Sequence, residues 1–72
     1  MDRGYMVRFT ITNTLKDILR CAKGGNTYCV AIYKENLIGV LLYMVSVGDI
    51  TEETYNRVMA LMRTITQKYK VY

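Results

Sequence analysis

Three observations predict a small α+β fold, mostly helical, for this sequence. Apolar and polar residues alternate near the N terminus, as in a strand with one buried face, whereas the last third repeats apolar residues with the period of a helix. The chain has 72 residues, 51% hydrophobic and 22% charged, which is the balance of one folded domain. We therefore expect a single domain over residues 1–72, with an N-terminal strand, a short helix and a C-terminal helical hairpin.

The N-terminal strand is predicted over residues 5–12, and a short helix over residues 13–23. Within the first segment the apolar side chains fall on one side of a strand, and they are Tyr5, Val7, Phe9 and Ile11. Within the second segment the apolar residues share one helical face, and Gly24-Gly25 ends the helix.

The centre of the chain allows three interpretations. Residues 27–33 are β-branched and aromatic, which favours a second strand followed by a helix over 35–47. Alternatively, Asn26 or Thr27 caps one long central helix, which makes the fold all-α, or residues 34–36 form a hairpin turn between two strands. We favour the strand followed by the helix. Because residues 37–47 are apolar on nearly every side, we expect them to lie between two layers.

The last element is predicted to be an amphipathic helix over residues 51–69. Thr51 is a natural N-cap, and Glu52 and Glu53 lie in the first turn, where acids are favourable. With the helix over 35–47, this segment is expected to form an antiparallel hairpin around Gly48-Asp49.

The composition removes most catalytic and metal-binding chemistry. The chain has no His, no Trp and no Pro, and Glu52 and Glu53 are adjacent, so they point in different directions on a helix. Two cysteines alone cannot build a zinc site, and we interpret Cys21 and Cys29 as two buried, reduced thiols. We therefore expect no catalytic residues, no metal, no cofactor and no enzymatic activity.

The same features predict a cytoplasmic protein that does not bind membranes. Reduced thiols indicate a reducing compartment, and the first ten residues lack an apolar export signal. The longest apolar run, over residues 37–47, is shorter than the roughly 20 residues that span a bilayer.

The net charge of +4 is unevenly distributed along the chain. Residues 1–34 carry six cations and two acids, residues 35–53 carry four acids and no cation, and residues 54–72 carry four cations and no acid. An acidic belt between two basic ends suits self-association, and a core this small gains from burial against another chain. We therefore expect a homo-oligomer, most simply a homodimer.

The basic end of the chain is the candidate site for another protein. Leu61 lies off the apolar stripe of the last helix, among cations, as an apolar residue of a binding patch would. The candidate partner-binding residues are Arg57, Leu61, Arg63, Lys68 and Lys70.

Two short segments resemble parts of ribbon-helix-helix repressors. The first is the strand-like run that opens such repressors, here Val7-Arg8-Phe9-Thr10-Ile11, and the resemblance implies that Arg8 and Thr10 face the major groove of DNA. The second is similar to the second helix of the family and covers residues 53–59. The two segments lie too far apart to form one motif.

Two functions follow from these observations. The first is a non-enzymatic protein-binding module, a small regulator or inhibitor of the kind that mobile elements encode, which occupies a surface of a larger protein. The alternative is a dimeric ribbon-helix-helix-like transcriptional regulator, for which nucleic acid is the partner.

Overall fold

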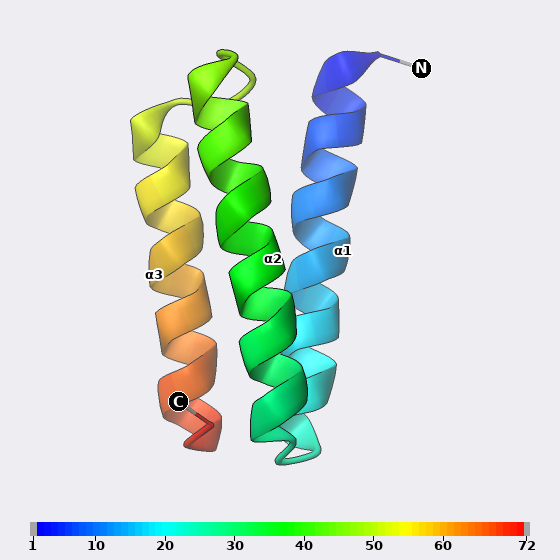
Figure 1. The fold of residues 1–72 in the computed structure, drawn as a ribbon, viewed down its shortest axis with the longest axis vertical. Helices are drawn as coiled ribbons and strands as arrows, with labels where there is room; N and C mark the ends of the chain where they lie inside the picture. Colours follow the sequence, from blue (N-terminus) through cyan, green and yellow to red (C-terminus); the bar gives the residue numbers. More distant parts are fainter. Residues whose placement is uncertain (1, 72) are drawn as a thin grey trace.

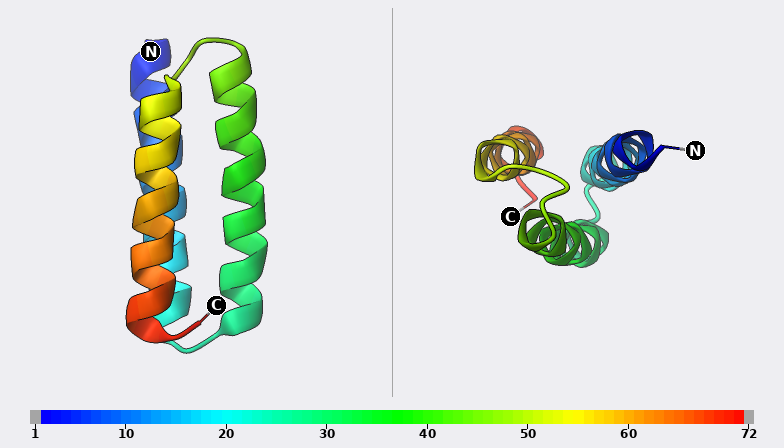
Figure 2. Two further views of the ribbon diagram at one scale, coloured as in Figure 1. Left: turned by 90° about the vertical axis from the view of Figure 1, so that its left-hand side faces the viewer. Right: turned by 90° about the horizontal axis from the view of Figure 1, so that it is seen from above.

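Three helices, joined by two tight turns, make up the protein (Figure 1). The computed structural model describes residues 2–71. Its elements are α1 (Arg3–Lys23), α2 (Thr27–Ser46) and α3 (Glu52–Tyr69). The helices α1 and α3 run parallel, α2 runs antiparallel to both, and the view from above shows the three at the corners of a triangle (Figure 2). Residues 2–71 contain no strand, so the predicted α+β class is wrong and the all-α alternative with a long central helix fits.

The N-terminal strand predicted over residues 5–12 is the first half of α1. The Asp2 carboxylate begins this helix by accepting a hydrogen bond from the Tyr5 N–H at 2.9 Å. Val7 and Ile11 are buried one turn apart, and the same buried face continues through the second half of the helix. The eight residues with period two thus also contain two apolar residues, Val7 and Ile11, at helical spacing. Burial along the full length of α1 favours the helix over the strand. The predicted end of the helix at Gly24 is confirmed.

The strand predicted over residues 27–33 is also helical, because these residues form the first turns of α2. Asn26 is the N-cap, and its side-chain oxygen accepts a hydrogen bond from the Cys29 N–H at 3.0 Å. Four apolar residues along one side of α2 are buried against α1 and α3: Val30, Leu37, Leu41 and Met44. This burial outweighs the strand propensity of the β-branched and aromatic residues.

The C-terminal helix and its hairpin with α2 are confirmed. Thr51 is the N-cap of α3, and its hydroxyl oxygen accepts a hydrogen bond from the Thr54 N–H at 3.1 Å. Val58 and Met62 are buried in the core. The expectation that residues 37–47 lie between two layers is wrong, because α2 packs on α1 and α3 with one side only and exposes the other.

A residue with left-handed backbone lies just after each of the three helices. Gly25 and Gly48, with φ of 70° and 79°, follow the caps of α1 and α2, and both belong to the turns expected from the sequence. Lys70 ends α3 with φ of 53°, although a side chain disfavours this conformation. The reversal lets the Val71 N–H donate to the Thr66 carbonyl at 3.0 Å and buries the Val71 side chain against the core.

A disulfide joins the end of α1 to the start of α2. Cys21 and Cys29 are bonded across the turn, with their Cα atoms 5.9 Å apart. Both residues are half-buried. The interpretation of two separate reduced thiols is therefore wrong. A helix over 13–23 and a strand over 27–33, as the sequence predicts, give no reason to place the two cysteines opposite each other.

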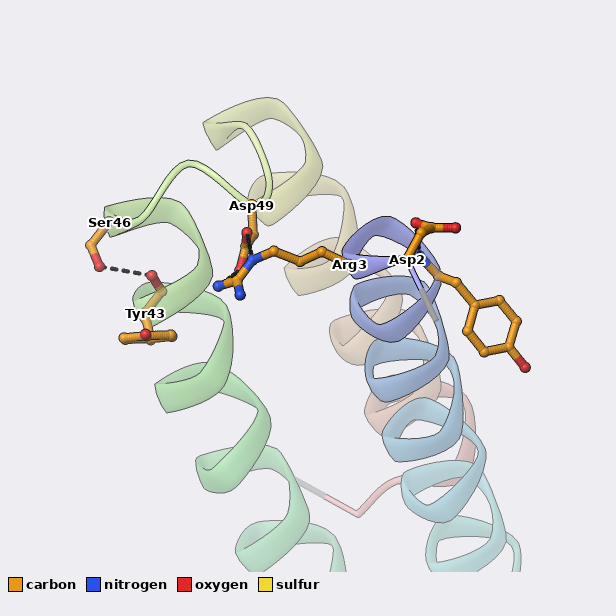
Figure 3. A network of polar contacts seen from close by, with 6 residues as sticks. Asp2, Arg3, Tyr43, Ser46 and Asp49 are labelled. Carbon is orange, nitrogen blue, oxygen red and sulfur yellow. Dashed lines mark hydrogen bonds and ion pairs between the residues drawn. The ribbon is translucent and has the colours of Figure 1, made fainter.

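A bidentate ion pair fixes the other end of the bundle (Figure 3). The Arg3 guanidinium reaches from the first turn of α1 to Asp49 in the α2–α3 turn, with Nε and Nη2 at 2.6 and 2.9 Å from the two carboxylate oxygens. The Asp49 carboxylate raises the pKa of Arg3, chiefly through these hydrogen bonds. The pair thus attaches α1 to the turn between the other two helices.

Breaking the disulfide is expected to destabilise the fold without changing it. Because the bond closes a short loop, a chain-entropy estimate gives a loss of about 2–3 kcal/mol in the free energy of unfolding for Cys21→Ser. Urea denaturation followed by circular dichroism measures the loss. Cys29→Ser should give the same value, and a reductant should destabilise the wild type but leave both variants unchanged. Equal stability of wild type and variants would contradict the bond's role.

The left-handed end of α3 predicts a stabilising substitution. Lys70→Gly removes the side chain that disfavours this backbone conformation and should raise the free energy of unfolding by about 1 kcal/mol. The matched control is Lys68→Gly, which places glycine inside the last turn and should lower it by about 1 kcal/mol. Both are measured by urea denaturation, and a loss for Lys70→Gly would show that the cap is not strained.

Candidate protein-interaction faces

The outer side of α1 carries an exposed pair of aromatic rings. Tyr5 and Phe9 lie one turn apart, their ring centroids are 5.9 Å apart, and their planes are nearly parallel. They are 45% and 49% exposed, although such rings are normally the first to be buried. Beside them is an open hollow of about 270 Å³, whose remaining lining residues are Arg8, Thr12, Asn13 and Lys16.

The two residues expected to read DNA lie on different sides of α1. Positions two apart on a helix are separated by about 200°, so Arg8 and Thr10 do not share a face as they would on a strand. Arg8 lines the aromatic hollow. Thr10 is half-buried, and its carbonyl accepts a hydrogen bond from the Thr14 hydroxyl at 2.9 Å. The strand on which the ribbon-helix-helix interpretation depended is absent from residues 2–71.

On α3, three of the five candidate partner-binding residues come together. Arg57, Leu61 and Lys68 lie within about 40° of one another around the helix axis. Leu61 is 48% exposed. Arg57 is held by Glu53, with Nη2 and Oε1 3.0 Å apart, and the Lys68 ammonium lies 5.5 Å from the centre of the Tyr69 ring.

The other two candidates lie apart from this stripe. Arg63 is about 160° away from Leu61 around α3, on a different side of the bundle. Lys70 is the left-handed residue that ends the helix, so its backbone has a structural role. The sequence groups four cations with the apolar Leu61 because all five lie near the basic end of the chain, and the helix separates them.

The aromatic hollow of α1 and the stripe of α3 face the same side of the molecule. On α1, Arg3 and Cys21 mark the flank toward α2, because they bind Asp49 and Cys29. Arg8 and the aromatic pair lie on the other flank, toward α3. The helices α1 and α3 run parallel to each other (Figure 2). Successive side chains of a right-handed helix advance clockwise when the helix is seen from its N terminus. This rotation places Leu61 on the flank of α3 toward α1.

We call this side the α1–α3 face. It combines two aromatic rings, one leucine and four cations, two from each helix. Its residues are Tyr5, Arg8, Phe9, Lys16, Arg57, Leu61 and Lys68.

A second exposed surface covers the outer side of α2. Tyr28, Leu42 and Tyr43 are 77%, 53% and 61% exposed, and Ile32, Val40 and Val47 are also uncovered. By length and composition α2 could cross a membrane, although core helices of soluble proteins pass the same test. Only 22% of its most apolar stretch is buried in the bundle. The apolar character of α2 therefore exceeds what the core uses.

Neither surface brings together groups suited to catalysis or metal binding. Within residues 2–71 no three Cys, Asp or Glu side chains gather as metal ligands, and both cysteines are bonded to each other. A further hollow of about 290 Å³ between α2 and Val71 has mostly apolar walls, with Lys34 and Glu35 at its edge. The two surfaces instead offer apolar contact area, charge and a hollowed shape, which suit the binding of another molecule.

Sequence reasoning missed the aromatic pair and the outer side of α2. Tyr5 and Phe9 were assigned to the buried side of a strand, where their spacing of four residues carried no meaning. That spacing, together with Arg8 and Lys16 on the same segment, was the available signal.

Comparison with known proteins identifies no relative of this chain. No protein-family model matches the sequence, and neither a curated protein nor a solved structure matches it.

Proposed function

We propose that the protein is a non-enzymatic binding module, a small regulator or inhibitor that occupies an acidic, partly apolar surface of a larger protein with its α1–α3 face. The observation that carries the proposal is the exposed Tyr5–Phe9 pair beside a hollow lined by Arg8 and Lys16. Aromatic and arginine side chains supply much of the affinity in protein interfaces, where they are enriched relative to the rest of the protein surface.

The cations of this face favour an acidic partner. Arg8 and Lys16 on α1 and Arg57 and Lys68 on α3 surround the apolar residues, as a polar rim surrounds the centre of an interface. Such a rim chiefly accelerates association with a surface of opposite charge and rejects basic ones. Leu61, half-exposed among these cations, would extend the apolar centre from the rings of α1 onto α3.

The helical structure of the ribbon segment argues against DNA binding by a ribbon-helix-helix motif. The cytoplasm remains the proposed location, although the disulfide removes the support that two reduced thiols would give. The Cys21–Cys29 bond is of a kind that persists in oxidising compartments, so the state of this pair in the cell tests the location. Alkylation of both thiols in freshly lysed cells would support the cytoplasm, and complete protection would contradict it.

Substitutions on the α1–α3 face are expected to abolish partner binding. Phe9→Asp and Leu61→Asp each place a carboxylate in the apolar centre, which should weaken binding about 30-fold or more, as loss of a hot spot does. The measurement is stoichiometric co-purification from the native host, followed by titration of the isolated partner. Circular dichroism verifies that each variant stays helical.

The matched control is Leu42→Asp, which makes the same change at a similarly exposed leucine on the outer side of α2. It should leave binding of the partner unchanged. Wild-type affinity of both Phe9→Asp and Leu61→Asp would overturn the proposal. So would binding of duplex DNA that requires Arg8 and Lys16 and weakens steeply with salt.

A further inference from the structure

We propose that the outer side of α2 binds a second copy of this chain, through an antiparallel pair of α2 helices. This surface is separate from the α1–α3 face, so the inference does not depend on the proposed function. It would account for the apolar side chains of α2 that the bundle leaves uncovered.

The exposed side of α2 carries a heptad-spaced seam. Six exposed residues follow one another at intervals of four and three, the spacing of the contact positions in a coiled coil. We call them the α2 seam: Tyr28, Ile32, Glu35, Gly39, Leu42 and Ser46. The buried residues on the opposite side, among them Leu37, Leu41 and Met44, have similar spacing and already pack on α1 and α3. The helix thus has two packing seams, and one lacks a partner within the chain.

The seam is complementary to its own antiparallel copy. Its spacing is symmetric about position 37, so an antiparallel copy aligns residues whose numbers add to 74. The resulting layers pair Tyr28 with Ser46, Ile32 with Leu42 and Glu35 with Gly39, each taken from opposite copies.

In this register large side chains meet small ones at both ends and in the middle. Tyr28 lies over Ser46 of the second copy, and Glu35 lies over Gly39, where a Cβ would meet nothing within 4 Å inside the chain. A parallel pair would instead place Tyr28 on Tyr28 and Gly39 on Gly39, which leaves layers of very different volume. Shape therefore favours the antiparallel arrangement.

Burial of this seam leaves the Ser46 hydroxyl group satisfied. The Ser46 hydroxyl already donates a hydrogen bond to the Tyr43 carbonyl within the helix, at 2.7 Å. Covering it with Tyr28 of a second copy therefore costs no donor. Glu35 is the one charged residue of the seam, and the missing side chain at Gly39 leaves it a route to water at the edge of the contact.

Charge also directs two copies to this side. Each chain has a net charge of +4, and α1 and α3 carry the excess of cations, whereas α2 contains one Lys34 and one Glu35. Two such molecules repel each other least when they meet through α2. A lipid bilayer fits the seam less well, because a flat or inserted α2 would place Glu35 among acyl chains.

The length and the exposed apolar side chains of α2 suit a dimer contact. Specific interfaces bury about 800 Å² on each partner, which is about a sixth of the 4982 Å² that this chain exposes. A helix of the length of α2 spans about 30 Å. Along it lie exposed large apolar side chains on and beside the seam: Tyr28, Ile32, Val40, Leu42, Tyr43 and Val47.

Sedimentation equilibrium of the purified chain tests the proposal. The wild type should show a concentration-dependent dimer, and Leu42→Glu should raise its dissociation constant about 30-fold or more. Leu61→Glu is the matched control, at a similarly exposed leucine on α3, and should dimerise like the wild type. A wild-type monomer throughout the micromolar range would overturn the proposal, as would equal effects of the two variants.

Two further variants test the antiparallel register. Gly39→Lys places an ammonium opposite Glu35 of the second copy and should keep or tighten the dimer, whereas Gly39→Glu should weaken it about tenfold by like-charge repulsion. In a parallel pair position 39 meets itself, so both variants would weaken it, and this outcome would contradict the register. Dimer loss in the presence of zwitterionic phospholipid vesicles, with Leu42-dependent binding to them, would assign the surface to a membrane instead.

Discussion

The fold depends on the burial of one side of α2 between α1 and α3. Leu37 and Leu41 are almost completely buried there, and α2 is the helix through which the two turns connect the others. Because the turn after α1 and the turn before α3 lie at opposite ends of α2, α1 and α3 run parallel and meet along their own flanks. The direction of every exposed side chain, including those of the α1–α3 face, follows from this arrangement.

A core of this size needs support at its ends, and each end has it. The Cys21–Cys29 bond restrains the α1–α2 turn, and the Arg3–Asp49 pair attaches the start of α1 to the α2–α3 turn. The covalent bond limits the freedom of the unfolded chain, whereas the ion pair orients one helix and is weakened by solvent, since Arg3 is largely exposed. Burial against a second chain, which the sequence analysis expects for so small a core, is therefore not needed to explain stability.

The sequence predicted α3 because every local signal agreed there: the Thr51 cap, the acids of the first turn and a helical apolar period. It failed for α1 and for the start of α2, where short runs such as residues 5–12 fit a strand and a helix equally well. Only the distant partners decide between them, since Val7 and Ile11 are buried by other helices. The candidate site suffered from the same error, because Arg8 and Thr10 share a face only on a strand.

The uneven charge of the chain acquires a spatial meaning in the bundle. The acids of residues 35–53 lie mostly at the α2–α3 turn, where Asp49 binds Arg3, and only Glu35 lies on the exposed seam. Most of the cations lie on α1 and α3, so the apolar rings of the α1–α3 face are surrounded by positive charge whereas the apolar side of α2 is nearly neutral. Two exposed apolar surfaces with different charge suit different partners, an acidic protein for one and an identical chain for the other.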